Sequence, residues 1–294
     1  MKQHDSQLSL WWLAIRPRTL PAAAAPVAVG AAMAIHDTVF SLLPVVAAFM
    51  GALLLQIAVN LANDYFDAKN DIDSEARLGP VRVTQSGLIP PGRVKGAMIL
   101  CLTLAALIFI YMTKVGGLPI FTVGVASVLA ALAYSGGPYP LASHGLGELF
   151  VFIFFGLVAV CGTYWVQAVS LSWLVVAASL PPGFLISAIM VVNNLRDRNT
   201  DSVAGKRTLA VRLGEINTIR LYRNLIALSY LVVLLLSGLS SDPAILLPFA
   251  TLPIARSMWR EIKAAKGSEL NETLARTAKF SLLFSLLFAV GLAV

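Results

Sequence analysis

Long apolar stretches, separated by short polar connections, run along the whole chain. Each is close to the ~20 residues that a helix needs to cross a hydrocarbon core of about 30 Å. Runs such as AAFMGALLLQIAV (47–59) are continuous, whereas the strands of a membrane β-barrel alternate between apolar and polar residues. We therefore predict nine transmembrane helices, at residues 11–35, 39–62, 93–113, 116–134, 146–166, 171–192, 217–238, 242–260 and 274–294.

Charged residues are scarce and fall almost entirely on one side of these helices. They make up 13% of the 294 residues, and the mean hydropathy is +0.80. If the N-terminus is cytoplasmic, Lys114 alone of the 22 Lys and Arg residues lies outside, as positive-inside orientation requires. We predict an all-α, multi-pass protein of the inner cell membrane, with one domain spanning 1–294. The net charge of +7 then reflects orientation and anionic lipid, and requires no nucleic-acid partner.

Two polar connections stand out, at residues 63–92 and 193–216, and both lie on the cytoplasmic side. Each begins with asparagines at the end of an apolar helix and continues through spaced aspartates. On a helix that continues past residue 62, the step of 100° per residue places four of these side chains within an arc of about 100°. These are Asn60, Asp64, Asp67 and Asp71.

The second connection repeats this pattern, because Asn193, Asp197 and Asp201 are spaced by four residues. Asp73 points away from the first stripe on a continuous helix, so it reaches the same site only if that helix has ended. Polar side chains at membrane depth usually face a cavity or a partner. We therefore expect the two carboxylate stripes to face one cavity.

Clustered carboxylates repel one another unless a cation lies between them, and a ligand set made only of oxygen atoms suits Mg²⁺. The candidate ligands are Asp64, Asp67, Asp71, Asp73, Asp197 and Asp201. Basic residues follow each motif: Arg77 and Arg82 after the first, Lys206 and Arg207 after the second. A site for a cation alone does not need these basic residues, but a diphosphate bound through Mg²⁺ does, because its oxygens also accept hydrogen bonds from Arg and Lys. The alternative is surface charge that balances the positive-inside residues.

At these residues the sequence resembles the UbiA superfamily of intramembrane aromatic prenyltransferases. The family pattern N-D-x-x-D-x-x-x-D matches Asn63, Asp64, Asp67 and Asp71, and its D-x-x-x-D matches Asp197 and Asp201. Three stretches resemble the MenA-type 1,4-dihydroxy-2-naphthoate polyprenyltransferases: RPRTLPAAAAPVAVG (16–30), RLGPVRVTQSGLI (77–89) and NNLRDRNTDSVAGKRTLAVRLGE (193–215). MenA-like sequences often carry Gly at the position of Asp71 and the next aspartate at that of Asp73, so either residue can support the metal.

The resemblance implies a nine-helix bundle around a central cavity that opens to lipid and is capped by the two polar loops. It implies Mg²⁺ as cofactor and a polyprenyl diphosphate and dihydroxynaphthoate as substrates. The metal and basic residues neutralise charge on the departing diphosphate, and the ring attacks the allylic carbocation with loss of CO₂. A lipid-walled cavity keeps water from quenching the cation.

Further candidates for substrate binding each have an ordinary structural alternative. Asn60 and Asn193 can orient carboxylates or phosphate oxygens, or cap helices. Asn63 is a candidate because it matches the family pattern. Arg16 can reach the acceptor carboxylate or the diphosphate, or anchor the first helix. Tyr134 and Tyr139, in YSGGPYP, can shield the cation or lie at the membrane interface.

Two other functions compete with this prediction. A relative in the same superfamily would prenylate 4-hydroxybenzoate or homogentisate. A divalent-cation transporter would also place aspartates at helix ends, although transport sites usually lie near the bilayer midplane. A phosphatidyl-alcohol transferase is disfavoured because its D-G-x-x-A-R element is missing.

Overall fold

The computed structural model describes residues 6–69 and 78–294, and these residues contain helices and no strand. The first predicted membrane helix, 11–35, is broken in two at Arg16. α1 (Gln7–Ile15) and the short turn η1 (Pro17–Thr19) meet α2 (Pro21–His36) at a bend of 48°. Prolines lack the N–H that continues a helix and disfavour helical backbone in the preceding residue, which explains the break. Arg16 accordingly has φ 52° and ψ 71°.

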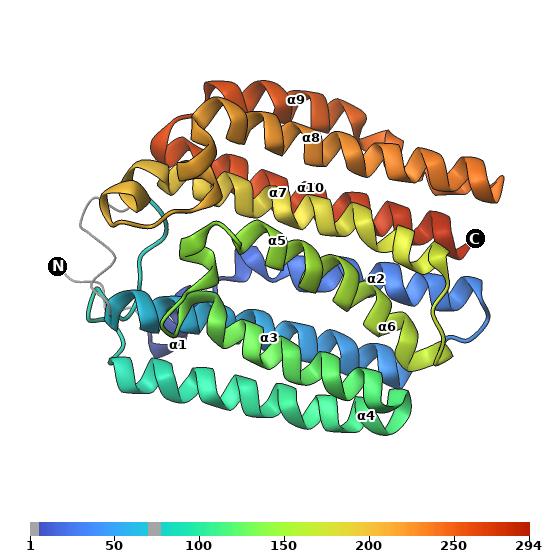
Figure 1. Ribbon diagram of the computed structural model, residues 1–294, viewed down its shortest axis with the longest axis horizontal. Coiled ribbons are helices and arrows are strands. Elements are labelled where there is room, and N and C mark those ends of the chain that lie inside the picture. The colour runs from blue at the N-terminus through green and yellow to red at the C-terminus, as the bar shows by residue number, and fades with distance from the viewer. Residues whose placement is uncertain (1–5, 70–77) are drawn as a thin grey trace.

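α3 (Leu42–Lys69) continues seven residues past the predicted span, as the spacing of its polar residues required. α4 (Pro91–Ser135) contains both the third and the fourth predicted spans. Its backbone turns at Gly117, whose φ of 71° suits glycine, and Pro119 follows. The two halves of α4 run back along each other in Figure 1, so the predicted pair of antiparallel helices is present.

The fifth predicted span is composite. After the short turn η2 (Leu141–His144) it comprises α5 (Gly147–Val151), a wider π-helical stretch η3 (Phe152–Val158) and α6 (Ala159–Ala168). Widened turns of this type reorient side chains locally and are common at functional sites. η3 therefore directs a group of phenylalanines toward the interior described below.

The predicted polar loop 193–216 is wrong over most of its length. α7 (Trp173–Val203) continues through it for eleven residues, and α8 (Leu209–Ser240) starts within it, with a break at Gly214 (φ 73°). A helix satisfies its backbone hydrogen bonds internally, so leaving the apolar region does not end it. The remaining connection is 204–208, and the second motif's aspartates lie on α7 itself.

The last spans are η4 (Pro243–Thr251) with α9 (Leu252–Ala264), then the turn η5 (Gly267–Glu269) and α10 (Leu270–Ala293). Six helices of the described residues are long and apolar enough to cross a membrane, and the bent pair α1–α2 makes a seventh. Because α4 doubles back and η4 with α9 fills 242–260, the nine predicted segments are all helical within the described ranges. α1 and the last turn of α10 lie toward opposite ends of the bundle (Figure 1).

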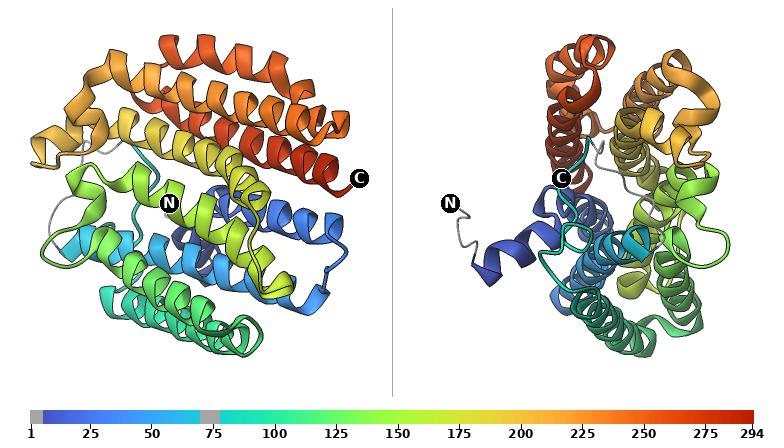
Figure 2. Two further views of the ribbon diagram at one scale, coloured as in Figure 1. Left: turned by 45° about the vertical axis from the view of Figure 1, so that its right-hand side comes forward. Right: turned by 90° about the vertical axis from the view of Figure 1, so that its left-hand side faces the viewer.

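A large apolar cluster lies between α7, α8 and α10, where Tyr222, Phe284 and Phe288 are fully buried. A second apolar cluster joins α3 to the first half of α4 around Leu61 and Val94. Viewed along the helices in Figure 2, right, α8 and α9 lie at one edge and α4 at the other, with α2, α3 and α5–α7 between them. This middle layer, together with α4, surrounds the cavities of the site.

Candidate active site

The first motif lies on the last three turns of α3, where its side chains take different directions. Asp64 is 1% exposed, and its two carboxylate oxygens accept the backbone N–H groups of Val83 (3.0 Å) and Thr84 (2.9 Å). Asp67 instead accepts a 2.6 Å charged hydrogen bond from Arg82 and faces a cavity. The predicted stripe is thus divided: Asp64 holds the returning loop segment, and Asp67 reaches the site.

The second motif lies on the last turns of α7, with Asn193, Asp197 and Asp201 on one side of the helix, as their spacing predicts. Both carboxylate oxygens of Asp197 accept from the buried guanidinium of Arg196, at 2.8 and 2.6 Å. Such a two-pronged contact is strong and fixes the plane of the carboxylate. Asp201 lies one turn nearer the loop.

A polar cavity of about 100 Å³ lies where the ends of α3 and α7 meet. The Lys206 Nζ lies 3.8 Å from an oxygen of Asp67 and 3.8 Å from an oxygen of Asp201, so one cation stands between carboxylates of both motifs. The residues from the predicted set that line this cavity are Arg16, Asn63, Asp67, Arg82, Tyr134, Asn193, Asp197, Asp201 and Lys206.

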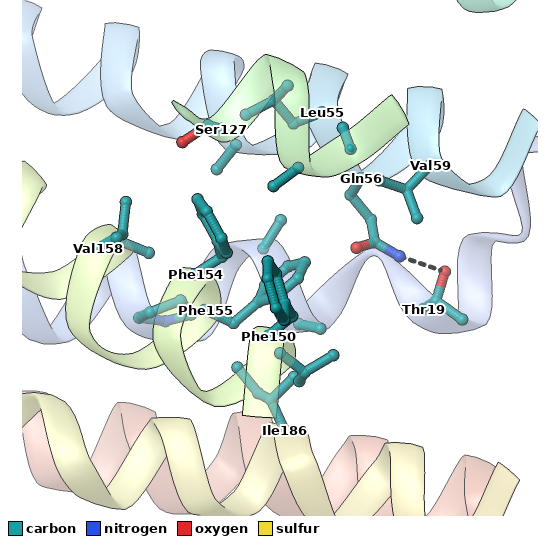
Figure 3. Close-up of a pocket in the computed structure, with 18 of the residues that line it drawn as sticks. Thr19, Leu55, Gln56, Val59, Ser127, Phe150, Phe154, Phe155, Val158 and Ile186 are labelled. Atoms are coloured by element: carbon teal, nitrogen blue, oxygen red, sulfur yellow. Dashed lines mark hydrogen bonds between the residues drawn. The ribbon is translucent and has the colours of Figure 1, made fainter. Parts of the chain in front are cut away.

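An apolar cavity of about 250 Å³ continues from the polar one into the bundle. Arg16, Asn63, Tyr134, Met190 and Asn193 line both cavities, so the two meet at these residues. Side chains from η3 and its flanks fill the apolar wall, and Figure 3 shows Phe150, Phe154 and Phe155 there, with Leu55, Ser127, Val158 and Ile186 around them. The combined space suits an amphiphilic ligand, whose charged head would lie in the polar cavity and whose apolar tail would lie in the apolar one.

The junction of the two cavities is braced by amides of α3. Asn60 Nδ2 donates to the Ile15 carbonyl (2.9 Å) and to Thr19 Oγ1 (3.0 Å), and Gln56 donates to the same hydroxyl (3.1 Å; Figure 3). These bonds hold the break after α1 that presents Arg16. Asn60 lines the apolar cavity, but its amide is directed at this break.

Tyr134 and Asn63 both lie at the junction of the two cavities. Tyr134 donates its hydroxyl to Met190 Sδ (3.2 Å), and Ser135 donates to the side-chain oxygen of Asn63. These contacts place a phenol and an amide where the polar and apolar cavities join.

Other predicted residues do not reach either cavity. Tyr139 is 55% exposed and stacks on His144. Arg207 is exposed, and its backbone N–H donates to the Ser143 carbonyl. Asp71, Asp73 and Arg77 lie outside the described residues.

Sequence reasoning assigned no role to four polar side chains beside the site. Arg196 is 5% exposed, Asn194 donates 2.8 Å to buried Glu148, and Asn271 from α10 accepts from Arg196. The sequence could have pointed to Arg196, because it lies inside the second motif, between Asn193 and Asp197. Glu148 and Asn271 are isolated in the sequence, and only the fold brings them to α7.

The described side chains test whether a metal fits. Among them, no three His, Cys, Asp or Glu residues are close enough to hold a metal ion alone. The donors around the polar cavity are nevertheless oxygen atoms, as a hard cation requires, and the Lys206 ammonium already lies between Asp67 and Asp201. The set fits a divalent cation that completes its shell with a ligand's own oxygens.

Comparisons with known proteins agree with this geometry. The UbiA prenyltransferase family pattern matches residues 23–287. Two relatives named 1,4-dihydroxy-2-naphthoate octaprenyltransferase are similar over nearly their whole length. The one from Escherichia coli K12 is 36% identical, over 99% of this chain and 97% of its own. The one from Haemophilus influenzae is 34% identical, over 99% of this chain and 98% of its own.

The fold is similar to that of a solved UbiA homolog from Archaeoglobus fulgidus bound to DMAPP and Mg²⁺. That structure matches with a TM-score of 0.68 at 15% identity, over 97% of this chain and 99% of its own. Together these matches confirm the resemblance that the paired aspartate motifs indicated.

Proposed function

Because the chain belongs to the UbiA prenyltransferase family, we propose that it transfers a polyprenyl group from a prenyl diphosphate to 1,4-dihydroxy-2-naphthoate. Diphosphate and CO₂ leave, and demethylmenaquinone forms for menaquinone synthesis. Full-length relatives of that name support the acceptor. The observation that carries the proposal is the pair of joined cavities, since a prenyl diphosphate has a charged head and an apolar tail of that arrangement.

The diphosphate head belongs in the polar cavity. Arg82 and Lys206 supply positive charge there, and each already contacts a carboxylate of a motif. Asn63 and Asn193 add amides at the junction. Planar guanidinium and ammonium donors stabilise the charge that grows on a phosphate leaving group, where few waters compete.

Magnesium would supply the remaining positive charge that the head group needs. Asp67, Asp197 and Asp201 would hold it, with Asp71 or Asp73 as a further ligand. When bound, Mg²⁺ neutralises the departing diphosphate as a Lewis acid. The chain's own part is to hold these carboxylates in place, through Arg82 for Asp67 and Arg196 for Asp197.

The apolar cavity holds the prenyl tail and excludes water from the reacting carbon. The donor's C–O bond breaks with its electron pair leaving on diphosphate, and the allylic cation lies near Tyr134 and the phenylalanines of η3. The acceptor ring forms the new C–C bond. Loss of its carboxylate as CO₂ returns an electron pair to the ring. Arg16, which lines both cavities, is placed to hold that carboxylate before transfer.

The reaction takes place at the cytoplasmic face of the inner membrane. The Lys and Arg bias favours a cytoplasmic N-terminus, and α3 and α7 both end near the polar cavity. The water-soluble acceptor then reaches the site from the cytoplasm and the released diphosphate leaves to it, while the prenyl tail of the donor enters from lipid.

Purified protein in lipid nanodiscs tests this function. With Mg²⁺ and a prenyl diphosphate, dihydroxynaphthoate should yield a prenylated product of the mass expected after CO₂ loss, and EDTA should abolish turnover. Mass spectrometry of the lipid extract measures the product. Transfer to 4-hydroxybenzoate or homogentisate but not to dihydroxynaphthoate would overturn the acceptor, and turnover in EDTA would overturn the metal.

A further inference from the structure

The Arg196 guanidinium, near the end of α7, donates hydrogen bonds to four oxygen atoms on three side chains. Its side chain is 2% exposed. Besides its two bonds to Asp197, it donates from Nη2 to Asn193 (2.9 Å) and from Nη1 to Asn271 (2.8 Å). A guanidinium buried among membrane helices is costly unless its donors are satisfied, so these partners are also what makes it tolerable.

Asn271 extends this group of contacts from α7 to the segment that follows the first motif. Its oxygen accepts from Arg196, and its Nδ2 donates to the Leu78 carbonyl (2.8 Å). The segment that begins at Leu78 is also held at its other end, because Asp64 accepts from Val83 and Thr84. Arg82 lies between these two attachment points and faces the polar cavity.

We propose that Asn271 is a positioning residue that couples the Asp197 carboxylate to the Arg82 segment, so that both are fixed together when diphosphate binds. Asn271 itself lines neither of the two cavities. It acts through Arg196 on one side and through the Leu78 carbonyl on the other. This inference rests on the proposed function only in taking diphosphate as the ligand of the polar cavity.

The chemistry of an amide explains why this position needs asparagine. Asn offers one acceptor and two donors on one short side chain, so it serves a guanidinium and a carbonyl at once. Asn271→Asp keeps the acceptor for Arg196 but cannot donate to Leu78. Asn271→Leu keeps the approximate size and loses both bonds.

The two variants are compared with the wild type by isothermal titration with inorganic pyrophosphate and Mg²⁺, and by steady-state kinetics. We expect Asn271→Leu to weaken pyrophosphate binding about tenfold and to raise the KM for prenyl diphosphate similarly, the size expected for one lost hydrogen bond to a charged group. Asn271→Asp should lose part of this affinity. Asn217→Ala, at an exposed amide of α8, is the matched control and should behave as wild type.

Limited trypsin digestion gives a readout that needs no substrate. Cleavage after Arg82 should be faster in both Asn271 variants than in the wild type, and in Asn271→Leu combined with Arg196→Lys it should be no faster than in the fastest single variant. Unchanged pyrophosphate affinity and unchanged cleavage would overturn the coupling. A lower thermal stability with unchanged pyrophosphate affinity would also overturn it, because a merely structural role gives that result.

The outcomes also separate this inference from the proposed function. If the wild type binds Mg²⁺ and pyrophosphate but turns over no dihydroxynaphthoate, the acceptor assignment fails and the titration still decides the coupling. If the wild type binds no pyrophosphate, the coupling to diphosphate is overturned together with the proposed head-group site.

Discussion

The ends of α3 and α7 carry the same kind of motif, but the first uses its leading carboxylate in the fold and the second keeps both at the cavity. Asp64 is buried against backbone N–H groups, outside the polar cavity. Its counterpart Asp197 is held by Arg196 on its own helix and still lines that cavity. The trailing residues of the two motifs, Asp67 and Asp201, meet at Lys206.

This difference teaches that a family motif is not a list of equivalent ligands. A carboxylate that accepts two backbone N–H bonds stabilises a loop, and one that faces an ammonium 3.8 Å away can exchange that partner for a metal or a substrate. The two motifs should therefore respond differently to the same Asp-to-Asn change.

The largest effect is expected for the trailing aspartates. Asp67→Asn and Asp201→Asn remove the negative charges beside Lys206, so kcat should fall at least about 100-fold, the scale seen when a preorganised electrostatic partner is lost. Turnover of prenyl diphosphate by purified variants measures this. Asp242→Asn, at the opposite end of the bundle, should retain full activity. Near-normal kcat in either site variant would contradict the assignment.

Asp64→Asn should act on stability first. The new NH₂ group faces a backbone N–H, so one of the bonds to Val83 and Thr84 is lost and the segment loosens, at a cost of about 2 kcal/mol. Thermal unfolding in detergent should show a lower midpoint, and bound Mg²⁺ with pyrophosphate should restore part of it by mass action. Loss of turnover with an unchanged midpoint would instead make Asp64 a ligand of the reacting group.

Lys206→Met tests whether the two trailing carboxylates form one site. Without the ammonium, Asp67 and Asp201 repel each other, so Mn²⁺ alone should bind more tightly than in the wild type. The KM for prenyl diphosphate should rise about tenfold, because a cation for the head group is lost. Paramagnetic resonance of added Mn²⁺ measures the metal affinity. Weaker Mn²⁺ binding in this variant would show that Asp67 and Asp201 do not form one cation site.

The helical layout could be predicted from the sequence because it depends on local properties. The length of each apolar run set the number of spans, and the four-residue spacing of Asn193, Asp197 and Asp201 placed them on one side of a helix. The breaks at Arg16 and Gly214 had local signals too, in the flanking prolines and in glycine itself. What these signals did not give was how far α7 continues past the apolar region.

The partners of the site residues could not be predicted, because tertiary packing chooses them. The carboxylate of Asp64 accepts from N–H groups nineteen and twenty residues away, and no spacing in the sequence encodes that contact. Asn271 meets Arg196 across 75 residues only because α10 packs on α7. The sequence thus predicted the aspartates as a set. Only the structure shows that Asp64 holds the loop segment whereas the other described aspartates of the motifs line the cavity.

The smallest expected effects concern the leading asparagines, which extend the same comparison. Asn60 lines only the apolar cavity and its amide braces the break after α1, whereas Asn193 also lines the polar cavity and accepts from Arg196. Asn60→Leu should lower the free energy of unfolding by about 1 kcal/mol with little change in KM, and Asn193→Leu should raise the KM for prenyl diphosphate. Denaturation midpoints and initial rates, measured on the same preparations, distinguish the two. If Asn60→Leu raised KM without a change in stability, the first motif would reach the substrate one turn deeper than its hydrogen bonds indicate.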